Sequence, residues 1–336
     1  MKGCCAVPIT MKENYLMLMR GEQPEYVPAG YLERCTEFVT EDQIAPTFCP
    51  NGPIKTVYGV TYVGSADLMN GALPSGPPIL TDITKWRDVI HNPDNSHRDW
   101  EGYYKKQTDK FDRVNRVVKC HGGDYFLTLA SFMGFADALL AMYEEPEEVY
   151  ALFDYVSQHY LEVMEKQLDY VKPDVYTIMD DDAAALAPFF SLDTYRELVR
   201  PFHERHAKLA RERGVYLDRH DCGHCELFID DWVQMGVSSW NPAQVSNDLA
   251  GIKKKYGNRL AICGGWDNNG FLGSTAVDLE TLREKLMEYV DTLAPGGGFV
   301  YSPGISGKAD DPKVIERRQV LSDVYYNYAR DYYKTH

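Results

Sequence analysis

The sequence predicts an α/β fold, a (β/α)8 barrel of the TIM type, and three observations lead to this fold class. Short β-branched or aromatic runs alternate with helical stretches, which gives at least seven strands along the chain. Repeated strand and helix units build parallel sheets. The chain has 336 residues and no G-x-G-x-x-G follows any of these runs, which favours one closed barrel over an open dinucleotide-binding sheet.

The composition is that of an ordinary globular protein, and we expect a single domain over residues 1–336. Hydrophobic residues make up 44% of the sequence and charged residues 25%. These are usual values, and no apolar stretch approaches the ~18 residues that a membrane helix needs. The net charge of −15 and the lack of a basic patch argue against nucleic acid or a membrane surface as partner.

The cysteines and the N-terminal sequence indicate a reduced, cytoplasmic protein. The first residues lack the apolar core of a signal peptide. The sequence has eight cysteines, two of them adjacent at Cys4 and Cys5, and they do not follow the pattern of a disulfide framework.

The first 95 or so residues are predicted to form a helical and loop extension over the barrel mouth. Thr10 and Glu13 have capping-box spacing, which predicts a helix over 11–20. A Gly- and Pro-rich stretch follows, and long ordered loops are usually functional. The further expectations are a first strand at 26–33, a hairpin arm at 57–64, only loop at 71–80 and a short helix at 82–91.

From residue 98 onward the predicted elements alternate regularly. Strands are expected at 116–120, 175–182, 215–220, 237–241, 260–265 and 299–304. Helices are expected at 98–114, in two segments of 131–171 broken at Pro146, at 192–213, 225–235, 248–256 and 278–293, and then to Tyr333. The helix after Pro146 has the clearest 3.6-residue apolar period.

The active site of such a barrel lies at the C-terminal ends of its strands. Residues at the predicted strand ends are therefore the candidates for chemistry, and they are mostly acids, metal-ligating groups and aromatics. They are Glu33, Arg34, His121, Asp124, Tyr125, Asp180, Asp181, Asp182, His220, Cys222, Asn241, Gln244, Cys263, Trp266, Asp267, Tyr301 and Ser302.

Two of these residues form half of a metal site. His220 and Cys222 lie two apart at the end of a predicted strand, so their side chains point to the same face. An imidazole and a thiolate suit zinc better than a hard cation. The alternative is that His220 is a satisfied core histidine and Cys222 a small buried hydrophobic residue. Cys225 completes a C-x-x-C, which is weak evidence without a thioredoxin-like context.

Acidic and histidine side chains at the other strand ends are the candidate catalytic groups. Of the three consecutive aspartates at most two can point inward, and Asp180 and Asp181 are nearest the strand. His121 and Asp267 follow two other strands. The alternative for any one of these acids is a solvated loop.

Aromatic and amide side chains at the strand ends are the candidate substrate contacts. They would house a small methylated or methoxylated compound, although buried aromatics are more often part of the core. These residues are Tyr125, Phe126, Trp240, Gln244, Trp266 and Tyr301.

Several phrases, in their order along the chain, resemble the uroporphyrinogen decarboxylase superfamily. They are HDCGHC, NPAQ, DL-x-x-I-K-K-K-YG, LAICGGWD and LAPGGGFV, together with the opening MKENYLMLMRGEQPEYVP and SFMGFADALLAMYEEPEEV. The superfamily has H-x-C-G, a Gln-containing loop, L-x-x-G-G-x-D at a strand end and a late Gly-rich turn in corresponding places. The resemblance covers nearly the whole chain and implies the same barrel.

The superfamily contains two chemistries. True uroporphyrinogen decarboxylases carry R-Q-A-G-R at the first strand end, where this chain has PAGYLERC and only Arg34. The cobalamin-dependent methyltransferase branch binds zinc through H-x-C and a later cysteine. His220 and Cys222 match the first two ligands, but the late turn has glycine where the third cysteine would stand.

The third zinc ligand expected here is Cys263, with Cys225 or one of the three aspartates as alternatives, or no metal at all. Strand parity favours Cys263. Leu260 and Ile262 suit the outer face beneath the helices, which leaves Ala261 and Cys263 on the inner face. The alternative is that Cys263 is an ordinary buried thiol.

The resemblance implies a zinc-dependent methyltransferase. It would move a methyl group between a small methylated or methoxylated substrate, or a thiol acceptor, and a corrinoid carried by a separate protein, because the chain has no D-x-H-x-x-G module of its own. The alternatives are a metal-independent decarboxylase that uses Asp180 or a neighbour, and a non-catalytic barrel that binds a corrinoid or small ligand.

Overall fold

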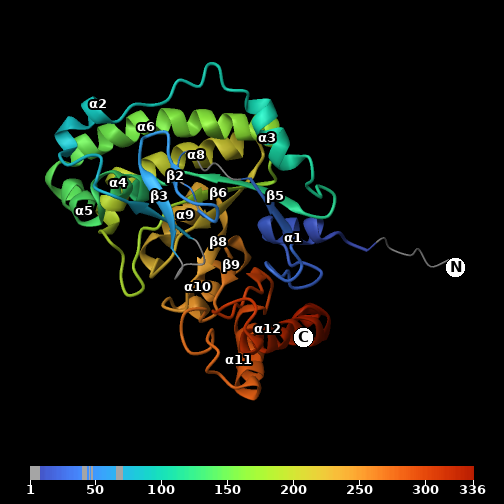
Figure 1. The fold of residues 1–336 in the computed structure, drawn as a ribbon. Helices are drawn as coiled ribbons and strands as arrows, with labels where there is room; N and C mark the ends of the chain where they lie inside the picture. Colours follow the sequence, from blue (N-terminus) through green and yellow to red (C-terminus); the bar gives the residue numbers. More distant parts are fainter. Residues whose placement is uncertain (1–7, 40–43, 45, 47, 66–70) are drawn as a thin grey trace. The chain divides into compact units, whose positions relative to one another are not determined.

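The computed structural model describes residues 8–39, 44, 46, 48–65 and 71–336 (Figure 1). They group into two compact units, each built from several chain segments. The first unit takes its described residues from Met1–Glu37, Phe111–Val118 and Val237–His336, and the second from Phe38–Lys110 and Lys119–Gly236. The single domain over 1–336 stays a prediction.

The α/β fold class is confirmed, with seven strands in one sheet of the described residues rather than the eight of a complete barrel. The hydrogen-bonded order is β1-β5-β6-β7-β8-β9-β10. The neighbours β5 and β6, β6 and β7, β8 and β9, and β9 and β10 are parallel. Their bounds are β1 Thr36–Phe38, β5 Val117–Gly122, β6 Val175–Met179, β7 Tyr216–His220, β8 Val237–Ala243, β9 Ala261–Gly264 and β10 Phe299–Val300.

The predicted strand 26–33 is wrong in extent. The structure reduces it to one parallel bridge between Ala29 and Tyr301. Pro28, which has no N–H to donate, limits further pairing. The next strand, β1, starts only after Arg34, where the backbone turns through a left-handed conformation with φ of 47°.

The register within the second unit positions the strand ends that matter most. Strand β6 pairs with β7 so that Met179, the last residue of one, lies opposite His220, the last residue of the other. The residues that follow these two strands therefore leave the sheet at the same level. Asp180 donates its backbone N–H to the carbonyl oxygen of His220 at 3.2 Å, which extends the pairing by one residue.

The helices of the second unit confirm most of the predicted pattern. The apolar period after Pro146 becomes α6, whose residues Val149, Phe153, Val156 and Tyr160 are buried. Figure 1 shows α6 beside α8. The helices are α2 Trp86–Val89, α3 Trp100–Thr108, α4 Tyr125–Met133, α5 Phe135–Glu144, α6 Pro146–Lys166, α7 Leu192–Thr194, α8 Arg200–Glu212 and α9 Ile229–Met235.

Helix α4 was not predicted to begin so early, and α3 ends at Thr108 rather than near residue 114. Helix α4 starts at Tyr125, directly after the loop that ends β5. It has no side-chain cap from its own N-cap residue, Asp124. Its cap comes from a distant part of the chain, which local sequence patterns cannot reveal.

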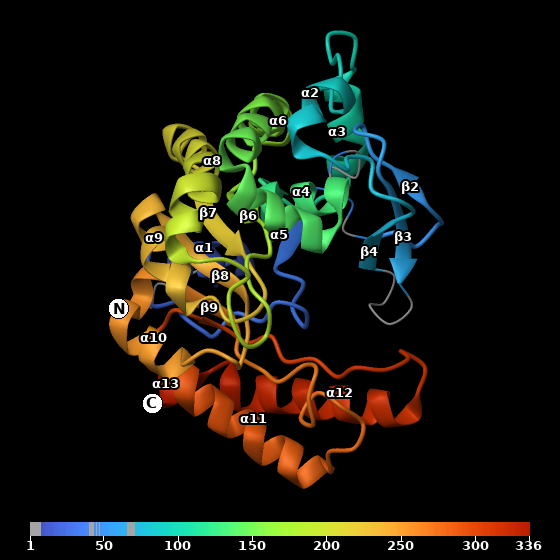
Figure 2. The ribbon, with the colours of Figure 1, turned by 90° about the vertical axis from the view of Figure 1, so that its left-hand side faces the viewer.

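A separate antiparallel sheet, in the order β2-β3-β4, also belongs to the second unit (Figure 2). It consists of β2 Ile54–Lys55, β3 Thr61–Ser65 and β4 Gly71–Ser75. The hairpin arm predicted at 57–64 is confirmed in part. The prediction of only loop at 71–80 is wrong, because residues 71–75 form an edge strand in which Pro74 lies opposite Tyr62, a position where proline is tolerated.

The first unit carries the predicted C-terminal helices. Figure 2 shows α11 and α12 side by side. The N-terminal helix is also confirmed, with the Thr10 side chain accepting from the backbone N–H of Glu13 at 3.1 Å. The helices are α1 Met11–Met19, α10 Leu249–Tyr256, α11 Leu279–Leu293, α12 Pro312–Val324 and α13 Tyr332–Thr335.

In the described part of the chain, no single helix is long and apolar enough to cross a membrane. The pair α4 and α5 passes the test together by length and composition, with a bend of 111° between them.

Candidate metal and substrate site

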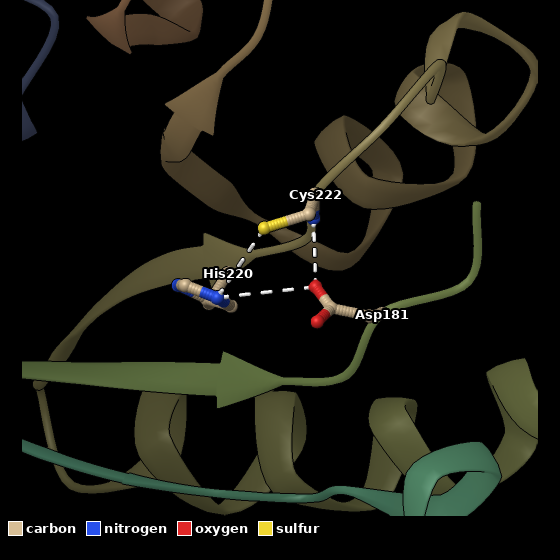
Figure 3. A group of neighbouring side chains, drawn as sticks. All are labelled: Asp181, His220 and Cys222. Atoms are coloured by element: carbon tan, nitrogen blue, oxygen red, sulfur yellow. Dashed lines mark hydrogen bonds and ion pairs between the residues drawn. The ribbon is translucent and has the colours of Figure 1, made fainter. Parts of the chain in front are cut away.

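Three metal-ligating side chains meet at the ends of β6 and β7 (Figure 3). His220 ends β7, Cys222 lies two residues further on, and Asp181 follows the end of β6. The Nε2 atom of His220 lies 3.9 Å from the Sγ atom of Cys222 and 3.9 Å from Oδ1 of Asp181. All three donor atoms lie within 4.8 Å of one another. Strand parity predicts that His220 and Cys222 lie together. They do lie together, although β7 ends at His220 and Cys222 belongs to the loop that follows.

The spacing of these atoms fits a zinc ion. Zinc takes imidazole, thiolate and carboxylate ligands at about 2.0–2.3 Å, so tetrahedral ligand atoms lie roughly 3.4–3.7 Å apart. The observed separations are 3.9 Å for two of the pairs and no more than 4.8 Å for the third, so the three ligand atoms need to move together by up to about 1 Å. Three protein ligands would leave a fourth position open, as in catalytic zinc sites.

The backbone fixes one of these contacts. The N–H of Cys222 donates to Oδ1 of Asp181 at 2.8 Å, which holds the loop after β7 against the loop after β6. Burial, and then the nearby Asp181 carboxylate, raises the pKa of the Cys222 thiol above its usual range. A bound dication would reverse that effect, because it stabilises the thiolate.

Asp180, a predicted catalytic residue, completes a helix terminus. It is fully buried, and its oxygens accept the backbone N–H groups of Tyr125, Phe126 and Leu127, each at 2.9 Å. These are N–H groups at the start of α4, which have no partners within the helix. Its catalytic role stays a prediction.

Asp182 lies in a buried ion cluster with Arg219 and Asp221. The Nη2 atom of Arg219 lies 2.6 Å from a carboxylate oxygen of each aspartate. All three side chains are fully buried. The N–H of Asp182 also donates to Asp221 at 2.9 Å. The cluster ties the residues that follow β6 to the end of β7.

A cleft of about 1020 Å³ opens beside this site. Its acidic and imidazole side chains are His121, Asp124, Asp181 and His220 at the strand ends, and Thr61, Ser75 and Ser131 add hydroxyl groups. The rest of the lining is mainly apolar and includes two aromatic side chains. The apolar and aromatic lining residues are Pro46, Val60, Tyr62, Ala72, Leu73, Pro74, Pro77, Pro78, Ile79, Leu127, Ala130, Phe135 and Met179.

Two of the polar groups in the cleft have pKa values that are shifted in opposite directions. Burial, and then the carboxylates of Asp180 and Asp181, raises the pKa of Asp124 to about 8. Burial, and then His220, lowers the pKa of His121 to about 4. Both groups are therefore mostly neutral near pH 7. Asp124 was noted only as a strand-end residue, and its position after β5 was the one signal that could have marked it.

Two predicted substrate contacts of the second unit, Tyr125 and Phe126, do not line the cleft. Both are fully buried, which matches the alternative that they are core. The Tyr125 hydroxyl lies 3.0 Å from Nε2 of His206.

The remaining predicted residues belong to the first unit, and their roles stay predictions. Trp240, Trp266 and Tyr301 are buried, and the Tyr301 hydroxyl donates to the carbonyl of Leu321 at 2.9 Å. Cys263 is buried on β9, while Gln244 and Asp267 are half-buried.

Comparisons with known proteins agree with this architecture. The family model described as uroporphyrinogen decarboxylase (URO-D) matches residues 126–309, which is more than half of the chain. No curated protein matches the sequence. A methyltransferase from Methanosarcina mazei has a similar structure, with a TM-score of 0.66, 12% identity, and coverage of 95% of this chain and 100% of that one. A sugar phosphate isomerase/epimerase from Parabacteroides distasonis, at 11% identity, covers 67% of this chain and 74% of its own, but its TM-score of 0.28 carries no weight.

Proposed function

The chain belongs to the uroporphyrinogen decarboxylase (URO-D) family, and we propose that it is a zinc-dependent methyltransferase. It would move a methyl group between a small methylated substrate, or a thiol acceptor, and a corrinoid carried by a separate protein. The observation that carries this proposal is the meeting of Asp181, His220 and Cys222 donor atoms within 4.8 Å, at the edge of a cleft that two of them line. We propose Asp181 as the third ligand, in the place that the sequence predicted for Cys263.

The side chains at the site have distinct tasks in this proposal. His220, Cys222 and Asp181 would hold the zinc, and the zinc, when bound, would supply a Lewis acid that activates a thiol or polarises a leaving group. The hydrogen bond from the Cys222 N–H to Asp181 keeps the carboxylate in place. The apolar wall of the cleft excludes water from the reacting groups.

The size of the cleft also supports a small-molecule reaction. At about 1020 Å³ it lies at the upper end of the range for ligand sites, roughly 300–1,000 Å³. A small substrate would leave room for a second reactant to approach.

A decarboxylase acting through Asp180 has less support. The carboxylate oxygens of Asp180 already accept three backbone N–H groups, and the described lining of the cleft contains no Lys or Arg to hold a polycarboxylate. A protein with a net charge of −15 is a poor host for such an anion without basic side chains.

The test is a methyl-transfer assay with zinc-loaded protein. Free cob(I)alamin is mixed with methylated amines, methyl ethers and methyl thioethers, and the appearance of methylcobalamin is followed by absorbance. The reverse reaction uses methylcobalamin and thiols. We expect activity that falls at least 100-fold in the Cys222→Ala variant. Release of carbon dioxide from carboxylated substrates, with no methyl transfer in either direction, would replace this function by decarboxylation.

A further inference from the structure

Asp124 is a buried carboxyl group in the cleft without a cationic partner. Its residue is 7% exposed, and it lines the cleft together with His121 and Asp181. Its carboxyl group accepts a hydrogen bond from its own backbone N–H. No Lys or Arg among the described residues forms an ion pair with it. Buried carboxylates are normally paired with a cation, and no described Lys or Arg takes that place beside Asp124.

The buried basic side chains nearest in the sheet already have partners. The ammonium group of Lys119, on β5, lies 3.0 Å from Asp218. Arg219, on β7, pairs with Asp182 and Asp221. Its charge lowers the pKa of Asp124 by less than burial and the neighbouring carboxylates raise it, so that pKa stays raised. The described lining of the cleft has no Lys or Arg. Apart from the proposed zinc, this described lining therefore supplies no permanent positive charge.

Two aromatic side chains, Tyr62 and Phe135, line the same cleft. Aromatic rings attract cations through their faces, and a methylated ammonium group is a frequent partner of such rings. An acid without a counter-ion beside aromatic and apolar walls is the arrangement expected for an organic cation.

We infer that the substrate of the cleft carries a positive charge, a methylated ammonium group, and that Asp124 is its counter-ion. This inference rests on the proposed methyl transfer and names the substrate class for it. An ammonium group beside Asp124 would supply the missing partner and stabilise the ionised carboxylate. A carboxylate, sulfonate or phosphate beside Asp124 would face another carboxyl group, with no Lys or Arg in the described lining to offset its charge.

The first test compares three probes of nearly equal shape and different charge. They are choline, its uncharged isostere 3,3-dimethylbutan-1-ol and the anion 3,3-dimethylbutanoate. Binding to the zinc-loaded protein is measured by calorimetry at pH 8. We expect choline to bind at least tenfold more tightly than the alcohol, which is about 1.4 kcal/mol, and the anion to bind most weakly. Equal binding of choline and the alcohol, preference for the anion, or no binding of choline at millimolar concentration would overturn the inference.

The second test assigns the preference to Asp124. The Asp124→Asn variant keeps the size of the side chain and removes its charge, so its preference for choline over the alcohol should fall at least tenfold. The control is Asp88→Asn, the same change at an exposed position outside the cleft lining, which should keep the full preference. An unchanged preference in Asp124→Asn would overturn the assignment even if choline binds.

These measurements do not depend on methyl transfer, so the two proposals can fail separately. Choline preference without methyl transfer to cobalamin would leave the cation site intact and remove the proposed function. Methyl transfer from uncharged ethers, without any charge preference in binding, would keep the function and overturn the cation site.

Discussion

The three consecutive aspartates after β6 belong to two regions of the molecule that differ in structure. Asp180 and Asp182 belong to a buried support, where one caps α4 and the other pairs with Arg219. Asp181 lies between them at the open cleft, beside His220 and Cys222. In the support every carboxylate has protein partners, whereas at the cleft Asp124 has no cation. The difference indicates that the support residues hold the strand ends in place, whereas the ionisable side chains of the cleft are available to contact a ligand.

The largest expected loss of folding stability comes from a substitution in the ion cluster of the support. Arg219→Met leaves Asp182 and Asp221 buried without their shared partner. Removing one partner of a buried pair typically costs about 3–5 kcal/mol, so we expect the free energy of unfolding to fall by that amount in urea titrations.

A triple variant is the control for this effect. Arg219→Met combined with Asp182→Asn and Asp221→Asn removes all three charges, and most of the lost stability should return. A loss below about 1 kcal/mol in Arg219→Met alone would contradict the view that this cluster supports the strand ends.

Removing the charged cap of α4 should cause a smaller loss of folding stability. Asp180→Asn replaces one accepting oxygen by an NH2 group, so at least one backbone N–H at the start of α4 loses its partner. Losing a charged cap of this kind costs about 2 kcal/mol. Urea unfolding monitored by circular dichroism measures the loss. A stability equal to that of the wild type would show that these N–H groups find other partners.

Substitution of Asp124 in the cleft should raise the free energy of unfolding, whereas the substitutions in the support lower it. The folded-state pKa of Asp124 is about 8, above the unfolded value of about 3.9. Between these values the unfolded chain releases a proton that the folded protein keeps, so this carboxyl group destabilises the fold increasingly as the pH rises.

Asp124→Asn removes that penalty, and we expect metal-free protein to gain on the order of 2 kcal/mol at pH 7. The gain should shrink as the pH falls and should vanish below about pH 4, where the unfolded chain also becomes protonated at this carboxyl group. Unfolding curves of both proteins at pH 4.5, 6 and 7.5 give the comparison. A gain that does not depend on pH would mean that Asp124 is ionised in the folded protein.

The smallest expected effect on stability is at the proposed metal ligands. His220→Ala and Cys222→Ala should change the free energy of unfolding of metal-free protein by less than about 1 kcal/mol, because both side chains lie at an open site. Zinc bound after dialysis should nevertheless fall below a tenth of its level in the wild type. A large loss of stability would place His220 and Cys222 in the support instead.

The sequence could predict features that depend on local pattern. The buried stripe of α6 followed from its apolar period. The proximity of His220 and Cys222 was expected from strand parity and is found, although β7 ends at His220. Non-local contacts could not be predicted in this way. Helix α4 begins at Tyr125 because Asp180, 55 positions later in the chain, caps it.

The tasks of the three aspartates also depend on contacts that sequence does not display. Asp182 has an internal role only because Arg219 lies on the neighbouring strand. Asp124 was named among the strand-end candidates but given no role, because an acid after a strand gives no sign of its missing counter-ion. Strand β4 was missed because Pro74, read as a loop residue, is tolerated on the edge of a sheet.

The central claim is that Asp181, His220 and Cys222 together bind zinc, and the zinc X-ray absorption spectrum of the loaded protein tests it most directly. We expect about one zinc per chain, with one sulfur ligand near 2.3 Å and the other ligands nitrogen or oxygen near 2.0–2.1 Å. The spectrum should be unchanged in Cys263→Ser, and zinc affinity should fall in Asp181→Asn. Two sulfur ligands, one of them lost in Cys263→Ser, or no bound zinc, would contradict the claim.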